Sequence, residues 1–477
     1  MKKPNIILIT TDQMRGDCLG IAGHPDVKTP YLDTLAARGT LFTNAYTACP
    51  TCIPARAALL TGMSQKRHGR VGYEDGVPWD YPHMLPQVLA DNGYHTECIG
   101  KMHVHPPLLR CGFHDLQLHD GYLRYYRGPD IPYFWHQHVS DSYIQWLREK
   151  YGPAADVTDP GVECNSWVAR PWIYDEMSHP TNWVVTRSLD FLRARDRSLP
   201  FFLHVSFVRP HPPFDAPAVY FDMYRDRDLR PPALGDWEED DSQSLRGRMY
   251  DAGCGSGDAE LRRQAMIGYY ACITQVDHQI GRLLQRLDEE RVLDDTVIVF
   301  TSDHGELLFD HHMFRKTRMY QGSVHVPLVV KPGRNIPWEL PQQTDRLTEL
   351  RDIMPSLLGL AGIDVPDTVD GMDFAQQPGE SREYLHCEHA NGELSAHCIV
   401  TRSEKYIWYS QTGLERLFDL ESDPCEEHDL IKIHPERAAR LRERLIAELT
   451  GREEGYSDGK NLIIGRTPVN ILAHLLT

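Results

Sequence analysis

The chain has 477 residues, of which 41% are apolar and 25% charged, with a net charge of −18. That length favours a large domain with a smaller companion, and the composition is typical of a soluble globular protein. The negative charge argues against a nucleic-acid or anionic-membrane partner, because binding to phosphates relies on excess lysine and arginine. The net charge is compatible with a small anionic substrate, because a few cations and a metal close to the substrate outweigh the more distant negative charges.

The N-terminal segment and the cysteines indicate the cellular compartment of the protein. The N-terminal apolar segment 6–9 is too short for the core of a signal peptide, and no apolar run is long enough to span a bilayer. Eleven cysteines without a framework pattern agree with a reducing compartment. We therefore predict a cytoplasmic protein.

Strand and helix patterns alternate through the first three quarters of the chain. Short apolar, β-branched runs predict strands, and apolar residues at helical spacing predict helices. The expected strands are 5–10, 94–99, 201–207, 296–300 and 326–330, and the expected helices are 29–39, a helix from residue 52, 84–92, 182–195, 259–293 and 348–360. The segment 111–180 has poor periodicity and many aromatic residues, such as the run 133–138. It predicts an irregular insertion that either lines a substrate pocket or folds over the surface.

The pattern changes after about residue 373. Short alternating segments such as 399–401 and 405–409 predict an antiparallel sheet, followed by a helix at 435–449. The tail 461–477 could serve as a subunit arm in a homo-oligomer. The fold class expected is α/β: a large doubly wound domain over residues 1–373, with a mixed, mostly parallel sheet and helices on both faces. A smaller C-terminal α+β domain with a short antiparallel sheet follows over residues 374–477.

Polar residues follow four of the expected strands. They are Asp12, Lys101 with His103, His211, and Asp303 with His304. Because the carboxyl ends of parallel strands meet at one edge of a sheet, we expect these groups to form one site. Two carboxylates, an imidazole and a hydroxyl from residue 52 would suit a divalent cation, and Lys101, Arg56 and Lys316 would balance the charge of a substrate.

The stretch 49–62 predicts a small-residue turn that enters a short helix with Pro54 in its first turn and Gly62 as its stop. Cys52 then lies at the helix N-terminus, where free N–H groups favour an anion, and Arg56 lies one turn further on. Cys49 and Cys52 also fit a thioredoxin-like redox pair, but the following Pro54-x-Arg56 is not part of that motif.

The pattern Cys52-x-Pro54-x-Arg56, followed by Ala-Ala-Leu-Leu-Thr-Gly, resembles the signature of the sulfatases, in which the cysteine is oxidised to formylglycine. Further blocks similar to that family are 5–13, 93–103, 210–213, 302–306, 315–328 and 417–424. The chain is thus identified as a member of the formylglycine-dependent sulfatase family of the alkaline phosphatase superfamily.

The resemblance implies a mechanism and a set of roles. Formylglycine from Cys52 is hydrated, and one hydroxyl attacks the ester sulfur. The implied metal ligands are Asp12, Asp303, His304 and Cys52 as formylglycine, with Gln13 the weakest candidate; the implied catalytic residues are Cys52, Arg56, Lys101, His103, His211 and Lys316. Arg56 would hold the diol, Lys101, His211 and Lys316 would contact the sulfate, and His103 would help to expel it. The implied partners are a small sulfated substrate and a formylglycine-generating maturation enzyme.

Two departures from the family bear on the metal. The family often has two aspartates at the first position and Asp-Asn at the later one, whereas this chain has Asp12-Gln13 and Asp303-His304. The site thus loses a negative charge and gains a nitrogen, which weakens the case for calcium, the family default. Manganese, magnesium and zinc stay open.

The expected function is hydrolysis of an aryl, carbohydrate or choline-type sulfate monoester with one divalent cation. A phosphonate monoester or phosphodiester hydrolase on the same scaffold is an alternative, since phosphate diesters and sulfate monoesters carry the same single charge. A catalytically silent sulfatase-like binding protein is a second alternative. Two further interpretations stay open: Glu306 is a substrate contact or a capping carboxylate, and the segment 386–389 reaches the pocket or merely ends a strand.

Overall fold

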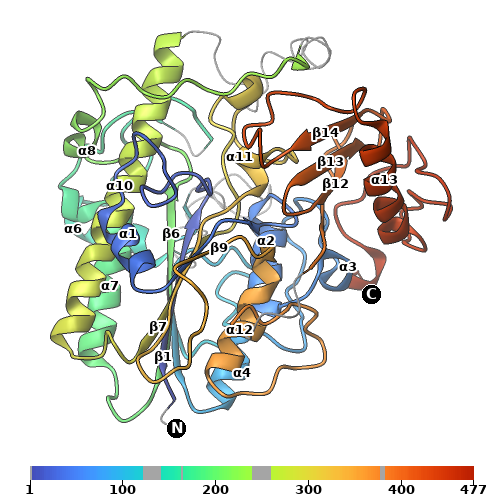
Figure 1. Cartoon of the computed structure of the whole chain (residues 1–477). Helices are drawn as coiled ribbons and strands as arrows, with labels where there is room; N and C mark the ends of the chain where they lie inside the picture. Colours follow the sequence, from blue (N-terminus) through green and yellow to red (C-terminus); the bar gives the residue numbers. More distant parts are fainter. Residues whose placement is uncertain (1–2, 122–140, 163–164, 239–258, 376–381, 477) are drawn as a thin grey trace.

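The computed structural model describes residues 3–121, 141–162, 165–238, 259–375 and 382–476. Its main body is built around an eight-stranded sheet with the order β5-β4-β6-β1-β7-β8-β2-β9 (Figure 1). The strands are β1 Asn5–Asp12, β2 Thr40–Phe42, β4 His95–Gly100, β5 Asp115–Leu118, β6 Phe201–Pro210, β7 Thr296–Ser302, β8 Leu328–Lys331 and β9 Gln343–Thr344. Neighbours from β5 to β7 are parallel, and β8 runs antiparallel to β7 and β2. The mixed, mostly parallel sheet was therefore predicted correctly.

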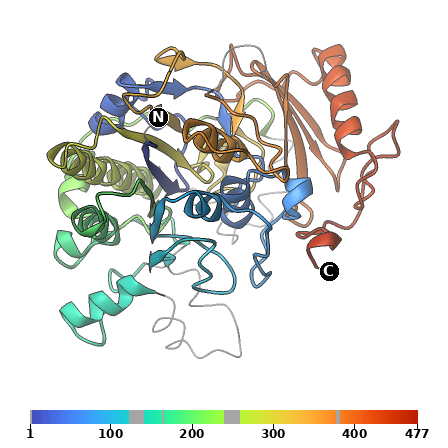
Figure 2. The ribbon, with the colours of Figure 1, turned by 90° about the horizontal axis from the view of Figure 1, so that it is seen from below.

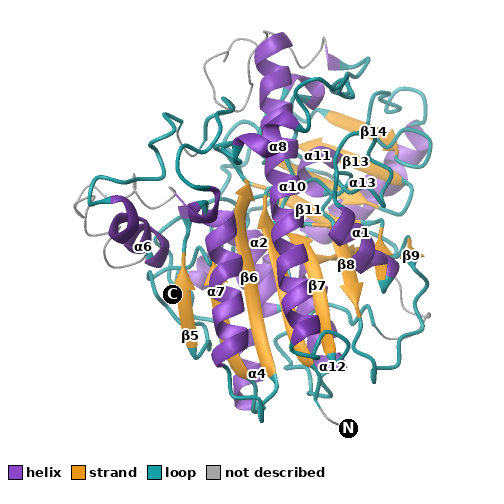
Figure 3. Ribbon diagram, turned by 90° about the vertical axis from the view of Figure 1, so that its left-hand side faces the viewer, coloured by secondary structure: helices purple, strands orange, loops and turns teal. Residues whose placement is uncertain are grey.

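Helices cover both faces of this sheet, because side chains along each buried strand alternate between two cores. Ile7 and Ile9 of β1 belong to one core, whereas Ile6 and Leu8 belong to the other. Figure 3 looks onto the first face, where α7 and α10 lie along the strands. That face carries α1 Pro30–Ala37, α7 Pro180–Ala194 and α10 Ala259–Glu289; the opposite face carries α2 Cys52–Thr61, α4 Leu85–Asp91 and α12 Ile353–Leu360.

Two expectations about local structure were wrong. The last helix of the main body begins at Ile353, not at residue 348, because Thr348 and Glu349 pair as β10 with β3 (Ala45–Tyr46). The insertion 111–180 contains β5, α6 (Ser142–Tyr151) and the 3₁₀ helix η2 (Glu176–Ser178), so it is more regular than predicted. Its aromatic run 133–138 lies outside the described residues. The other short elements are α3 Gln65–His68, α8 Ala218–Asp222, α11 Gln321–Val324, η3 Asp310–His312, η4 Leu350–Asp352 and η5 Ala473–Leu475.

A second, four-stranded antiparallel sheet lies beside the main body, as the red end of the chain in Figure 2 shows. Its strands are β11 Leu385–His389, β12 Ala396–Val400, β13 Glu404–Tyr409 and β14 Glu415–Asp419, and α13 Pro435–Leu449 covers one face. The other face packs against Tyr46, Tyr320 and Val324 of the main body. This agrees with the predicted α+β unit, while the boundary at residue 373 stays a prediction.

The C-terminal tail is partly docked on the main body. The backbone N–H groups of Val71 and Gly72 donate to Asn470 O, and Leu472 N donates to Gly69 O. Leu472 is buried, although most of the tail is exposed. Among the described helices, none has the length and apolar character required to cross a bilayer.

Candidate active site

The four polar strand ends lie side by side. β4, β6, β1 and β7 are consecutive in the sheet, and each ends at the same edge with the residues singled out in the sequence. Asp12 closes β1, Lys101 follows β4, His211 follows β6 and Asp303 follows β7. The side chains of these four residues are all buried.

Cys52 comes to this edge from a different element. It is the first residue of α2, after Thr51 in extended conformation, and the helix ends at Gly62 with φ 67°. The thiol is 1% exposed; its sulfur lies 3.3 Å from His304 Nε2, 3.5 Å from Lys316 Nζ and 3.7 Å from Asp12 Oδ1. Burial and Asp12 raise the pKa of this thiol, but Lys101, Lys316 and His304 bring it well below its usual value. The position thus favours a negatively charged group.

Four side chains offer donor atoms for a cation. Single ligand atoms of Asp12, Cys52, Asp303 and His304 all lie within 4.8 Å of one another. His304 Nδ1 lies 3.0 Å from Gly305 O, a contact that places the proton on Nδ1 and leaves the lone pair of Nε2 facing the cluster. The Cys52 sulfur stands where a formylglycine would present oxygen. A set of carboxylate oxygens, one imidazole nitrogen and such an oxygen suits a divalent cation.

Arg56 is enclosed by the same cluster. Its Nε donates to Asp303 Oδ2 over 2.9 Å, and its Nη1 donates to Lys101 O over 2.8 Å and Ser206 Oγ over 3.1 Å. The guanidinium therefore ties together α2 and the ends of β4, β6 and β7. Its Nη2 is buried and has no hydrogen-bond partner within the described ranges, which leaves one donor for the group at position 52.

Two lysines compensate the anions. Lys101 Nζ forms an ion pair with Asp12 in which both side chains are fully buried. Burial would raise the pKa of Asp12, but Lys101 and His211 hold it well below its usual value. Lys316 Nζ donates to Gln13 Oε1 over 2.6 Å as well as to Cys52.

Gln13 and Glu306 position Lys316. The Gln13 amide nitrogen donates to the Glu306 carboxylate, which also accepts from Leu308 N over 2.9 Å and Arg315 N over 2.5 Å. Glu306 thus fixes the loop that carries Lys316; it caps no helix among the described residues, and it does not line the cavity above Cys52. Both ends of the Gln13 amide are engaged, and its part as a metal ligand stays a prediction.

His211 and His103 both interact electrostatically with Cys52. His211 Nδ1 contacts Pro212 O at 2.8 Å, and burial, together with Lys316, lowers the pKa of its ring well below the usual value. His103 Nε2 lies 3.6 Å from Asp75 Oδ1. Burial and Lys101 lower the pKa of His103, but Asp75 and Cys52 raise it to a net upward shift. The site therefore contains a neutral and a more basic imidazole.

Comparison with known proteins identifies the family. The family model described as Sulfatase matches residues 4–363, and the model described as N-sulphoglucosamine sulphohydrolase, C-terminal, matches residues 309–454. The chain belongs to the sulfatase family. It is therefore a sulfuric ester hydrolase of the alkaline phosphatase superfamily, as the signature at Cys52 indicated.

Individual relatives span almost the whole of this sulfatase. An arylsulfatase of Clostridium perfringens is 50% identical over 99% of this chain and 100% of its own length. A choline-sulfatase of Rhizobium meliloti is 30% identical over 89% and 81%, respectively. The crystal structure of a phosphonate monoester hydrolase of Agrobacterium radiobacter is 28% identical and superposes with a TM-score of 0.76 over 93% of this chain and 95% of its own.

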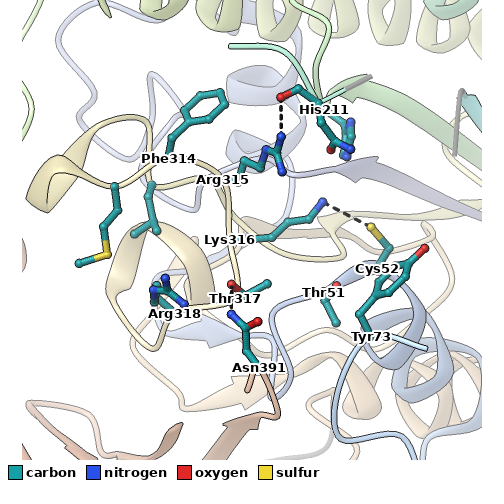
Figure 4. A pocket seen from close by; sticks show the side chains of 13 residues that line it. Thr51, Cys52, Tyr73, His211, Phe314, Arg315, Lys316, Thr317, Arg318 and Asn391 are labelled. Carbon is teal, nitrogen blue, oxygen red and sulfur yellow. Dashed lines mark hydrogen bonds between the residues drawn. The ribbon is translucent and has the colours of Figure 1, made fainter. Parts of the chain in front are cut away.

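A cavity of about 260 Å³ opens above Cys52. Figure 4 shows Thr51, Cys52 and Tyr73 on one side and the loop from Phe314 to Arg318 on the other. Asn165 of the insertion lines it too, in agreement with the pocket-lining interpretation of that segment. Asn391, just beyond β11, completes the wall from the second sheet, so the C-terminal unit of this sulfatase contributes to the pocket.

Sequence reasoning missed several supporting residues. Asp120 Oδ1 accepts from Met102 N over 2.8 Å and His103 N over 3.0 Å, which fixes the strand end that carries His103. Asp120 follows β5, so the strand-end rule could have found it. Arg209 forms a bidentate ion pair with Asp215 at 2.6 Å, and His179 Nε2 lies 3.2 Å from the same carboxylate. This pair holds the loop of His211, and no sequence pattern marks it.

The redox alternative finds no support. Cys49 and Cys52 are both buried free thiols, and only Cys52 belongs to the cluster of donor atoms. Of the segment 386–389, His386 contacts His397 at 3.2 Å, away from the pocket. His389 ends β11 close to Asn391.

Proposed function

We propose that this sulfatase hydrolyses sulfate monoesters through a formylglycine made from Cys52, with one divalent cation held by Asp12, Asp303 and His304. The observation that carries the proposal is the position of Cys52. Its sulfur lies at the N-terminus of α2, within 3.3–3.7 Å of His304, Lys316 and Asp12. A nucleophile there is next to a cation site and to a lysine that can hold an anion.

The group at position 52 would supply a hydroxyl nucleophile, and the cation would supply positive charge that polarises the ester. The residues of the chain do the remaining work. Lys101 and Lys316 bind and orient the sulfate oxygens by charge-assisted hydrogen bonds. His211 lines the pocket and is placed to contact the sulfate, and one of Lys101, His211 and Lys316 helps to protonate the departing alcohol.

His103 has a different task. Its ring is held by Asp75 and interacts with the group at position 52. It would accept the proton of the second hydroxyl there while the C–O bond to the transferred sulfate breaks, which releases sulfate and restores the aldehyde. Arg56 stays in place through the cycle, because its bonds to Asp303, Lys101 and Ser206 fix the base of the site.

The arylsulfatase relative supports an aryl sulfate as substrate, and the choline-sulfatase relative makes choline sulfate the second ester to test. We also propose a maturation enzyme as a partner, since an encoded thiol is the wrong nucleophile for this reaction. The cytoplasmic location and a homo-oligomer built through the tail stay predictions.

One experiment tests the nucleophile. The protein is expressed with and without a formylglycine-generating enzyme, the peptide that contains Cys52 is weighed, and turnover of 4-nitrophenyl sulfate is measured. We expect the aldehyde mass and activity to rise together, and Cys52→Ala to lower kcat by at least about 10³-fold. Cys49→Ala is the matched control, since it removes a buried thiol three residues away. Full activity with an intact Cys52 thiol would contradict the proposal, as would a clear preference for an aryl phosphonate ester.

A further inference from the structure

Arg318 is a buried cation without a counter-ion on the wall of the pocket. The side chain is 8% exposed, and its Nη1 is buried with no hydrogen-bond partner. It lines the cavity next to Lys316, Thr317 and Asn391, as Figure 4 shows. No ion pair of its guanidinium occurs in the parts of the chain that the structure describes. Because an unpaired buried charge is costly, we expect this side chain to meet an anion in the working enzyme.

The other cations of the pocket have tasks already. Lys316 donates to Gln13 and to Cys52, where the reacting sulfate would bind. Arg315 donates from Nη2 to Asn165 O over 2.7 Å. Among the described residues that line the cavity there is no acidic side chain, although the chain carries a net charge of −18. The positive charge of Arg318 is therefore in excess of what one sulfate monoester requires.

The backbone that carries Arg318 is held in place by distant parts of the chain. Thr317 has φ 77°, a conformation that is unfavourable for a β-branched residue. Its N–H donates to Pro50 O over 3.2 Å, and its Oγ1 accepts from Asn391 Nδ2 over 3.2 Å. The turn before α2 and the second sheet thus fix the loop together. A loop that is fixed before the ligand arrives loses less entropy on binding.

His389 adds a second unpartnered polar group in the same region. It is 3% exposed at the end of β11, and neither ring nitrogen has a hydrogen-bond partner in the described part of the protein. Burial lowers the pKa of this ring to about 3, and Arg318 is the largest of the charges that act on it. His389 is therefore a buried neutral imidazole two residues before Asn391, which lines the cavity.

We propose that Arg318 binds a second anionic group of the substrate, which the departing alcohol carries. This deepens the proposed function and rests on it. A guanidinium fork matches the two oxygens of a carboxylate or of a further sulfate. The preferred substrates are accordingly aryl or sugar sulfates with a carboxylate or a second sulfate on the same ring, and sulfate esters of neutral alcohols are poorer.

The test uses pairs of aryl sulfates that differ only in this charge. The matured enzyme is assayed on 3- and 4-carboxyphenyl sulfate, on their carbamoyl counterparts, and on 1,3- and 1,4-phenylene disulfate. We expect the anionic members to have a kcat/KM about tenfold or more above the neutral ones. Arg318→Gln should abolish that difference, because it should lower kcat/KM for the anionic esters about tenfold more than for the carbamoyl esters. Arg318→Lys keeps the positive charge but lacks the two parallel N–H donors of arginine, so it should retain part of the preference for anionic esters. Arg38→Gln is the control: Arg38 is exposed and paired with Asp294, and its replacement should leave the preference unchanged.

The outcomes separate the two proposals. Turnover of the carbamoyl esters without any preference for the anionic ones would overturn the subsite and leave the proposed function intact. An equal loss on all esters in Arg318→Gln would overturn it too. If no ester is turned over, the proposed function fails, and calorimetric binding of the carboxyphenyl sulfates to the wild type and to Arg318→Gln then decides the subsite. Equal affinities would refute it. Whether the carboxylates or the disulfates are preferred identifies the anion.

Discussion

Arg56 Nε donates a 2.9 Å hydrogen bond to Asp303 Oδ2, and the two side chains are 1% and 0% exposed. This ion pair joins the first turns of α2 to the end of β7, which are about 250 residues apart in the sequence. Because Asp303 also belongs to the cluster of donor atoms, the pair orients one ligand of the proposed cation while it locks the nucleophile's helix onto the sheet.

Arg56→Lys should therefore damage stability and metal binding together. A lysine has a single donor head and cannot bond at once to Asp303, Lys101 and Ser206, so we expect about 2–4 kcal/mol less stability. Urea unfolding and the metal content of the purified protein are the measurements. Arg442→Lys is the matched control, because it alters a bidentate pair with the partly exposed Glu415, where about 1 kcal/mol or less is expected. Equal losses in the two variants would contradict this view.

Removal of the cation should inactivate the enzyme reversibly. Dialysis against a chelator is expected to abolish turnover and lower Tm, and addition of a divalent cation should restore both, since a ligand that binds only the folded state stabilises it. Mn²⁺, Mg²⁺, Zn²⁺ and Ca²⁺ are tested separately. His304→Ala should lower the metal content, whereas His312→Ala, at a partly exposed histidine of η3, should not. Unchanged activity after complete chelation would exclude a cation at this cluster.

Much of the main body follows from local pattern. The runs that form β1, β6 and β7 are mainly apolar, as is typical of strands buried on both faces, and parallel strands place their carboxyl ends at one edge. The strand-end rule therefore predicts that four residues meet at one edge of the sheet: Asp12, Lys101, His211 and Asp303. Their individual roles stay predictions.

Apart from Asp120, the residues that sequence reasoning missed depend on tertiary contacts. Thr348 lies in a segment with helical spacing, but its pairing with Ala45 overrides that preference. Asp215 and Arg318 lie in loops, where neither periodicity nor spacing marks a residue. The groups around each of them come from segments that are far apart in the sequence and meet only in the folded chain. The pairing of Asp215 with Arg209, and the unpartnered Nη1 of Arg318, therefore could not be predicted.

Gly100 is a backbone position that no side chain can occupy. It has φ 109°, and a Cβ there would lie 1.8 Å from Ser206 O on the neighbouring strand. Gly100→Ala should cost about 3–5 kcal/mol and displace Lys101, with a large fall in kcat. Gly93→Ala is the control, because Gly93 has φ 84° but no atom within 4 Å of the added Cβ, so about 1–2 kcal/mol is expected. Similar urea midpoints for the two variants would show that the close approach is unimportant.

The Arg209–Asp215 pair predicts a pH dependence of stability. Burial would raise the pKa of Asp215, but Arg209 and His179 lower it to about 2 from an unfolded value of 3.8. The ionised carboxylate therefore stabilises the folded state by roughly 2–3 kcal/mol above pH 4, and this contribution is lost as the pH falls towards 2.

Asp215→Asn tests this by urea unfolding at several pH values. The wild type should exceed the variant in stability at pH 6, and the difference should shrink below pH 4. Asp190→Asn removes a carboxylate paired with two exposed or half-exposed arginines and should leave the pH profile nearly unchanged. A difference between Asp215→Asn and the wild type that is constant down to pH 3 would contradict the assigned cause.

The position of β1 between β6 and β7 also means that its sheet can be completed only late in translation. β1 pairs with β6 on one side and β7 on the other, and β7 ends about 250 residues after Cys52. At 5–20 residues per second, a ribosome needs roughly 10–50 s to make that stretch. Throughout this interval the chain lacks the strand that carries Asp303, so the cluster that buries Cys52 is not yet assembled. The proposed maturation enzyme would thus have tens of seconds to act on Cys52 of each nascent chain, and slower translation would widen that interval.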